Sequence, residues 1–165
     1  MSADGTEETP WLDETEQAVW RRYISVMRLL PDRLNASLTR GHGLTLIDYE
    51  VLARLSEAPL RRLRMTELAE GALLSKSRLS HQISRMEKEG LVRREPCETD
   101  GRGFYAVLTD AGWDKLLLAV PTHVRDVREA FITPLSRAQL TALGDALDAI
   151  GKALEAGRTP ESGRE

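Results

Sequence analysis

The sequence has few of the residues and runs on which several classes of proteins depend. One cysteine, Cys97, is present in 165 residues, so an internal disulfide framework is excluded. The three histidines, His42, His81 and His123, lie far apart without the spacing of a metal site, so we expect no metal and no cofactor. No apolar run approaches the roughly 20 residues that a membrane helix requires. The N-terminus lacks a basic and apolar signal region, which favours a cytoplasmic protein.

Signatures of catalysis are missing too. We find no glycine-rich phosphate loop, no nucleophile elbow and no carboxylate pair in a recognisable frame, so the chain is not expected to be an enzyme. The net charge of −3 hides a strong local difference. Residues 1–20 carry six acidic and no basic side chains, whereas residues 61–102 carry ten basic and seven acidic ones. Positive charge is therefore concentrated in one segment, and binding to phosphate requires only such a local field.

That basic segment has the pattern of a helix, a turn, a second helix and a two-stranded hairpin. Thr66 is expected to cap the first helix, since its hydroxyl can accept from a free N–H group of the first turn. Ser75 is expected to cap the second helix, and Gly90 to follow its end in the left-handed conformation. Two strand-like runs, 91–94 and 104–108, flank a turn-rich stretch. This order predicts a winged helix-turn-helix.

The second helix has one apolar and one polar face. With about 100° per residue, Leu79, Ile83 and Met86 form a narrow apolar stripe, and the opposite arc holds no carboxylate. Serine and lysine suit phosphates, and an arginine such as Arg85 can pair with guanine. An ordinary solvated face is the alternative, but such faces usually mix charges of both signs. The predicted DNA-binding residues are Ser75, Lys76, Ser77, Arg78, Ser80, His81, Ser84, Arg85, Lys88, Asp100 and Arg102.

Two of these residues belong to the tip of the predicted wing. Arg102 lies between two glycines and can reach into the minor groove, where narrow A·T-rich DNA attracts arginine. The alternative is a surface arginine on a turn. Asp100 can hold Arg102, pair with an arginine of the recognition helix, or serve only as a turn residue.

Several short motifs resemble the MarR family of bacterial transcriptional regulators. They are Leu68-Ala69, Ser75-Lys76-Ser77, Arg85-Met86-Glu87, Gly90-Leu91-Val92, Asp100-Gly101-Arg102 and Leu108-Thr109-Asp110-Ala111-Gly112. The Asp-Gly-Arg wing with the Leu-Thr-x-x-Gly that follows it is the more specific signal. The resemblance implies a homodimeric repressor of double-stranded DNA whose affinity is often lowered by small aromatic or acidic ligands. Some relatives sense oxidants through a cysteine instead.

The predicted fold class is mainly α with a small β-hairpin wing, a winged helix-turn-helix with dimerisation helices at both ends. The expected segments are a disordered acidic N-terminus (1–10), an N-terminal dimerisation helix (11–44), the DNA-binding domain (45–112), C-terminal dimerisation helices (113–155) and a disordered tail (156–165). The recognition helix is expected at about 75–89 and the wing at about 91–108. Pro31 and Pro121 predict bends in the long helices.

The terminal segments have apolar stripes that are long for a winged domain. In the last one, Leu140, Leu143, Leu147, Ile150 and Leu154 step by three and four residues. These stripes can be buried within one chain or against a second copy, and we favour the second copy. A two-fold dimer would place two recognition helices about one helical turn of DNA apart, on a pseudo-palindromic operator.

A small effector could act between the dimer core and the winged arms. The candidates by composition are Trp20, Tyr23, Met27, His42 and Tyr49, each of which can equally be plain core. His42, between two glycines, can also be an exposed loop residue. His123, with Arg125 and Arg128 nearby, can bind an anion or form salt bridges between subunits.

Two alternatives remain open at this point. A redox role for Cys97 requires a thiol activated by cations such as Arg93 or Arg94, and Glu98 opposes it, so a structural cysteine is favoured. A winged helix can also serve protein contacts within a larger assembly. That function would require an apolar or acidic recognition face, whereas this face is polar and cationic.

Overall fold

The computed structural model describes residues 9–97 and 103–157 as a mainly helical fold with a small antiparallel sheet. In chain order its elements are α1 (Glu14–His42), α2 (Leu46–Glu57), η1 (Pro59–Arg61), β1 (Arg62–Arg64), α3 (Met65–Gly71), α4 (Lys76–Lys88), β2 (Val92–Pro96), β3 (Phe104–Leu108), α5 (Asp110–Val127), η2 (Arg128–Ile132) and α6 (Arg137–Ala156). The predicted fold class is confirmed. The wing tip with Asp100 and Arg102, and most of both ends that we expected to be disordered, lie outside the described residues.

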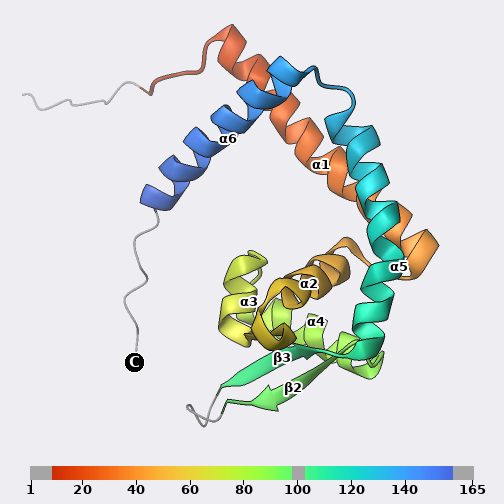
Figure 1. The fold of residues 1–165 in the computed structure, drawn as a ribbon. Coiled ribbons are helices and arrows are strands. Elements are labelled where there is room, and N and C mark those ends of the chain that lie inside the picture. The colour runs from red at the N-terminus through yellow and green to blue at the C-terminus, as the bar shows by residue number, and fades with distance from the viewer. Residues whose placement is uncertain (1–8, 98–102, 158–165) are drawn as a thin grey trace, which may run out of the picture.

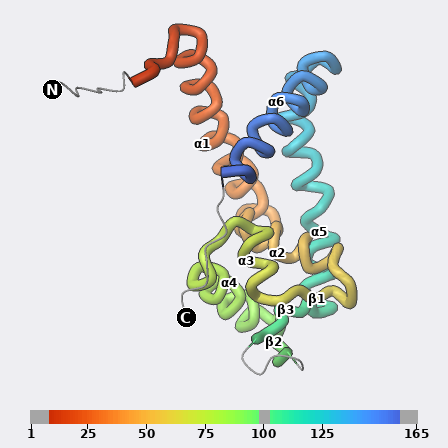
Figure 2. The backbone as a smooth tube through the Cα atoms, turned by 90° about the vertical axis from the view of Figure 1, so that its left-hand side faces the viewer, coloured from red at the N-terminus to blue at the C-terminus, as the bar shows by residue number. Residues whose placement is uncertain are grey.

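The molecule has two parts, which Figures 1 and 2 show from two sides. Helices α1, α5 and α6 form an elongated upper part, and the winged helix-turn-helix of α2, α3, α4 and the sheet lies below it. The lower half of α5 runs down beside the winged part and joins the two. The strands β2 and β3 project away from the helices at the lower end of the molecule.

Helix α1 lies within the predicted range of 11–44 and continues through its internal proline. Asp13 caps its start, accepting from the N–H of Glu16 at 2.8 Å. The helix then continues through Pro31, because proline removes one hydrogen bond but keeps a φ angle that a helix accepts. It ends at His42, before Gly43, whose φ is 64° and whose N–H donates to the carbonyl of Thr39. Helix α5 likewise continues through Pro121.

The helix-turn-helix departs from the prediction at its first helix. This helix begins at Met65, after Arg64, whose N–H donates to the Glu67 carboxylate at 3.2 Å, so Thr66 is not its cap. In the turn that follows, Leu73 takes a left-handed φ of 54° and is 82% exposed. The Ser75 cap is confirmed, since its hydroxyl accepts from the N–H of Arg78 at 3.3 Å.

The sheet has a third strand that the sequence pattern did not reveal. Its order is β1-β3-β2, with β3 in the centre and antiparallel to both neighbours. Strand β1 has only three residues and an arginine at each end, so it shows no run of apolar residues. Arg62 and Arg64 instead place their guanidinium groups 4.7 and 5.8 Å from the ring centre of Tyr105. Cation–π contacts therefore help to hold this edge strand on the sheet.

One core fixes the recognition helix to the rest of the winged part. The apolar stripe of α4 is confirmed, because Leu79, Ile83 and Met86 are all 0% exposed. They pack in a cluster with apolar residues of α2, α3, the sheet and α5, including Leu52 and Leu116. The orientation of α4 is thus set by burial on one side, which leaves its other side open.

The junction between the wing and α5 depends on a close contact at Gly112. The hydroxyl of Thr109 donates to the carbonyl oxygens of Gly90 at 2.7 Å and Leu91 at 3.0 Å, and accepts from the N–H of Gly112 at 3.0 Å. A Cβ atom on Gly112 would lie 2.1 Å from the Leu91 carbonyl oxygen. Only glycine therefore permits this approach of α5 to the end of α4.

Gly112→Ala should destabilise the protein by about 2 kcal/mol or more, because backbone must move to admit the methyl group. Urea unfolding followed by circular dichroism measures the effect. Gly41→Ala is the matched control, since Gly41 is also helical but has no heavy atom within 4 Å of its added Cβ. This control should raise stability by up to about 1 kcal/mol. Equal effects of both changes would contradict the proposed close contact.

Candidate nucleic-acid interface

The first two turns of α4 present an open cationic face. Lys76, Ser77, Arg78, Ser80 and His81 are all exposed on the side away from the core. The first turn contains no acidic residue. Among the residues that the structure describes, Lys76 and Arg78 take part in no ion pair, and neither does Lys88 near the helix end. The cationic side chains of this half of the helix can therefore contact an anionic partner without breaking an ion pair among the described residues.

The later turns of α4 are occupied by contacts within the protein. Ser84 accepts from the guanidinium of Arg94 at 3.1 Å, and the Ser80 carbonyl accepts from the same group at 2.9 Å. Gln82 and Arg85 both donate to Asp48 of α2. Of the predicted DNA-binding residues, Ser84 and Arg85 therefore have side chains that are already hydrogen-bonded to β2 and α2, unlike Lys76 and Arg78.

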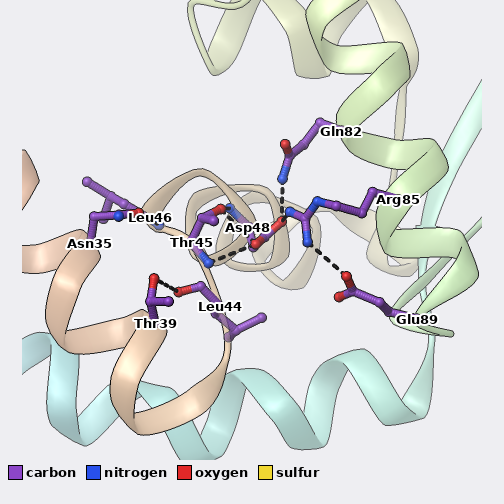
Figure 3. Close-up of polar contacts among 9 residues, drawn as sticks. All are labelled: Asn35, Thr39, Leu44, Thr45, Leu46, Asp48, Gln82, Arg85 and Glu89. Atoms are coloured by element: carbon purple, nitrogen blue, oxygen red, sulfur yellow. Dashed lines mark hydrogen bonds and ion pairs between the residues drawn. The ribbon is translucent and has the colours of Figure 1, made fainter.

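Asp48 is the buried centre of this internal network (Figure 3). Its side chain is 0% exposed. One carboxylate oxygen accepts from the N–H of Thr45 at 2.8 Å and from the Thr45 hydroxyl at 2.7 Å. The other accepts from the amide of Gln82 and the guanidinium of Arg85. Every partner that a buried carboxylate requires is supplied by two helix segments, the start of α2 and the middle of α4.

Arg85 is held by two carboxylates. Besides Asp48, it donates to Glu89 one turn later at 2.9 Å. Burial alone would lower the pKa of Arg85, but the charges and hydrogen bonds of Asp48 and Glu89 outweigh it and raise the pKa. The guanidinium thus points to α2 and along the helix (Figure 3), and its predicted pairing with guanine stays a prediction.

Further polar contacts connect this network to α1. The hydroxyl of Thr39 in α1 donates to the Leu44 carbonyl at 3.2 Å, and Asn35 accepts from the N–H of Leu46 at 2.9 Å. The end of α1, the start of α2 and the recognition helix are therefore linked by consecutive polar contacts (Figure 3). The sequence prediction missed Asn35, Asp48 and Gln82. Only the Thr45-x-x-Asp48 spacing, typical of a helix start, could have indicated one of them.

A hollow lies between α3, α4 and the far half of the wing strands. It has a volume of about 290 Å³, and its lining includes Arg64, Lys76, Arg94 and Cys97. Cys97 is 4% exposed, and its N–H donates to the Gly103 carbonyl at 2.9 Å. The predicted wing residues Asp100 and Arg102 lie outside the described residues, so their contacts with DNA stay predictions.

The five predicted ligand residues fall in two separate places. Tyr23 and Met27 line an apolar hollow of about 610 Å³ between α1, η2 and α6, and Trp20 stacks on Tyr23. His42 and Tyr49 lie at the other end of α1. A rise of 1.5 Å per residue separates Met27 from His42 by roughly 22 Å, so the five residues do not line one pocket.

His42 and Tyr49 belong to a half-buried polar junction between the end of α1, α2 and α5. His42 shares a hydrogen bond of 2.9 Å with Thr122, and the ring of Tyr49 lies 4.1 Å from that of His123. Burial, together with the charge of Glu57, raises the pKa of Tyr49. Burial lowers the pKa of His123, although the nearby Asp126 opposes this shift. Both pKa shifts favour the neutral forms of Tyr49 and His123 in this junction.

Two structural absences hold for the described part of the chain. It contains no group of three or more histidine, cysteine, aspartate or glutamate side chains that could hold a metal ion. None of its helices is long and apolar enough to cross a membrane.

Asp48→Asn should destabilise the protein by roughly 2–3 kcal/mol, because it leaves Arg85 beside a neutral amide in a buried network. The measurement is urea unfolding at neutral pH. Glu89→Gln is the matched control: it removes the other carboxylate that contacts Arg85, but from an exposed position, and should cost under about 0.5 kcal/mol. A larger effect of the control would show that Asp48 is not the anchor.

Comparison with known proteins agrees with this geometry. A model of the MarR family matches residues 42–103. The crystal structure of AbsC from Streptomyces coelicolor is 48% identical, with a TM-score of 0.85, and the match covers 90% of this chain and 99% of AbsC. Sco3205 from the same organism, a MarR family regulator solved in complex with DNA, is 43% identical with a TM-score of 0.86, over 94% of this chain and 96% of Sco3205. The regulator PecS of Dickeya dadantii is 28% identical over 133 residues, 79% of each chain. The chain therefore belongs to the MarR family, whose members are DNA-binding transcriptional regulators and not enzymes.

Proposed function

We propose that this protein is a homodimeric repressor that binds a pseudo-palindromic operator in double-stranded DNA and is released by a small aromatic or acidic ligand. The observation that carries the proposal is the open cationic face of the first two turns of α4. Lys76, Ser77, Arg78 and His81 are the proposed major-groove contacts. Arg102, with Asp100 beside it in sequence, is the proposed wing contact. Arg85 acts mainly as an anchor of the recognition helix through Asp48.

The apolar surfaces of the long helices support a dimer. None of the side chains of α6 is buried within one chain. Large apolar side chains are exposed on all three long helices: Val19, Trp20, Val26 and Leu29 of α1, Leu117, Leu118 and Val124 of α5, and Leu147, Ile150 and Leu154 of α6. A patch of this kind is typical of an interface between subunits. Two-fold symmetry would then give the protein two recognition helices, as a pseudo-palindrome requires.

Leu147→Asp should raise the dissociation constant of the dimer by at least a hundredfold, because a carboxylate would be buried in an apolar interface. Sedimentation velocity over a concentration series measures it. Ala149→Asp is the matched control, since this residue lies about 200° around the same helix. A dimer that persists in Leu147→Asp with unchanged affinity would show that the subunits meet elsewhere.

The apolar hollow between α1, η2 and α6 supports ligand release. Its volume of about 610 Å³ is within the range of small-molecule sites. Tyr23 offers an aromatic ring, and Arg22 is the one charged residue among the described residues that line this hollow. A ligand with an aromatic ring and an acidic group fits this combination. Since the hollow lies between helices of the proposed dimer core, a bound ligand could favour one arrangement of the arms over another.

Fluorescence anisotropy on DNA from upstream of the protein's own gene, against random DNA of equal length at two salt concentrations, tests the function. We expect a preference of about 10³ or more for the upstream DNA, lost when a salicylate-like phenol is added. Arg78→Ala should lower this affinity at least tenfold, whereas Arg40→Ala, an exposed arginine of α1, should leave it unchanged. Absence of binding to either DNA would favour a protein-interaction module. If the protein binds the upstream DNA selectively but no phenol weakens this binding, only the proposal of release by a ligand is overturned.

A further inference from the structure

Arg94 in the middle of β2 makes an unusually complete set of contacts with the recognition helix. Its side-chain Nη1 donates to Glu87 at 2.6 Å, and its backbone N–H donates to the other oxygen of the same carboxylate at 2.9 Å. Its Nη2 donates to the Ser80 carbonyl at 2.9 Å and to the Ser84 hydroxyl at 3.1 Å. One residue of the wing thus contacts three residues on two turns of α4.

These contacts join two elements that the chain itself connects only at one end. Between α4 and β2 the chain makes a short turn, and β2 then runs from Val92 to Pro96 toward the far end of the wing (Figure 1). Arg94 is paired with Ala106 of β3, so it lies at the middle of the wing ladder rather than at its base. A fixed contact at this point limits how far both wing strands can swing relative to α4.

The surroundings of the ion pair between Arg94 and Glu87 favour a strong interaction. The side chains of Arg94 and Glu87 are 24% and 28% exposed, so water screens their charges only in part. The carboxylate accepts two hydrogen bonds and the guanidinium donates to helix groups on both sides of it, so a change in the angle between wing and helix would break several bonds together. Charge-assisted hydrogen bonds in such a fork are directional as well as strong.

We propose that Glu87 and Arg94 are a positioning pair that fixes the angle between the wing and the recognition helix, and so sets the distance between wing and helix contacts on DNA. The inference rests on the proposed function in that the wing contacts DNA. Neither residue is required to touch DNA itself. Ser80 and Ser84 then belong to this positioning set, and contact with bases falls to Lys76, Ser77, Arg78 and His81.

Arg93 provides a matched comparison on the same strand. It is also a cation, but its guanidinium donates to Glu95 of its own strand at 2.6 and 3.0 Å and contacts no residue of α4 in the described part of the chain. Arg93→Met and Arg94→Met therefore remove the same charge from neighbouring positions. Only Arg94→Met removes the bridge between the wing and the helix.

The first arm of the test uses the full-length protein without DNA. Hydrogen–deuterium exchange, read by mass spectrometry, should show at least tenfold faster exchange in β2 and β3 for Arg94→Met and for Glu87→Gln. Arg93→Met should leave these rates within about twofold of the original protein, and α1 and α5 should be unaffected in all three. Unchanged exchange of the wing in Arg94→Met would overturn the proposal. This arm stands even if the chain binds no DNA.

The second arm distinguishes positioning from general stability. An operator is selected from random DNA with the original protein, and the variants are footprinted on it with hydroxyl radicals at saturating protein concentration. Arg94→Met and Glu87→Gln should lose protection of the flanking minor groove but keep that of the central major groove, and the double variant should resemble either single one. A merely structural role would leave the saturated footprint complete, and that result would overturn the proposal. Failure to select any operator would instead count against the proposed function.

Discussion

The winged part depends on one buried carboxylate whose charge must be neutralised from two directions. Asp48 is taken out of water completely, and such a group is stable only when each of its oxygens is paired. Thr45 supplies this pairing from the start of α2, and Gln82 and Arg85 supply it from α4. The position of the recognition helix relative to α2 is therefore specified by charge as well as by apolar packing. Apolar packing alone tolerates small rotations of a helix, whereas the hydrogen bonds to the Asp48 carboxylate form in only one orientation of α4.

Local features of the fold could be read from the sequence because local energies decide them. The Ser75 cap, the left-handed Gly90 and the apolar stripe of α4 depend on residues within a few positions of each other. Two partners of Asp48, Gln82 and Arg85, are 34 and 37 residues away in sequence, and no periodic pattern in the sequence indicates these contacts. Arg85 illustrates the difference. Its place on the polar arc of the helix was correct, but its distant partner determines what the guanidinium does.

Charge counted along the sequence overstates the charge that is open to a partner. Arg61, Arg62 and Arg64 contribute to the basic segment, yet the structure uses them to hold the sheet and α5 together. Arg61 lies 4.2 Å from the ring centre of Trp113, and the other two flank Tyr105. Arginine suits this double role because its planar, weakly hydrated cation stacks on a ring while one edge stays in water. The face of α4 is cationic for a different reason, since Lys76 and Arg78 there form no ion pair with any residue that the structure describes.

The single thiol of the chain, Cys97, makes local opening of the wing measurable by chemical labelling. Cys97 is almost fully buried, and its backbone is bonded across the hairpin to Gly103, so a thiol reagent can reach it only when this end of the wing opens. Under conditions where reclosing outpaces modification, the labelling rate is proportional to the equilibrium fraction of open molecules. Anything that holds the wing closed must slow that rate by the same factor. Thiol labelling would thus report the local opening equilibrium of the wing without an added probe and independently of global unfolding.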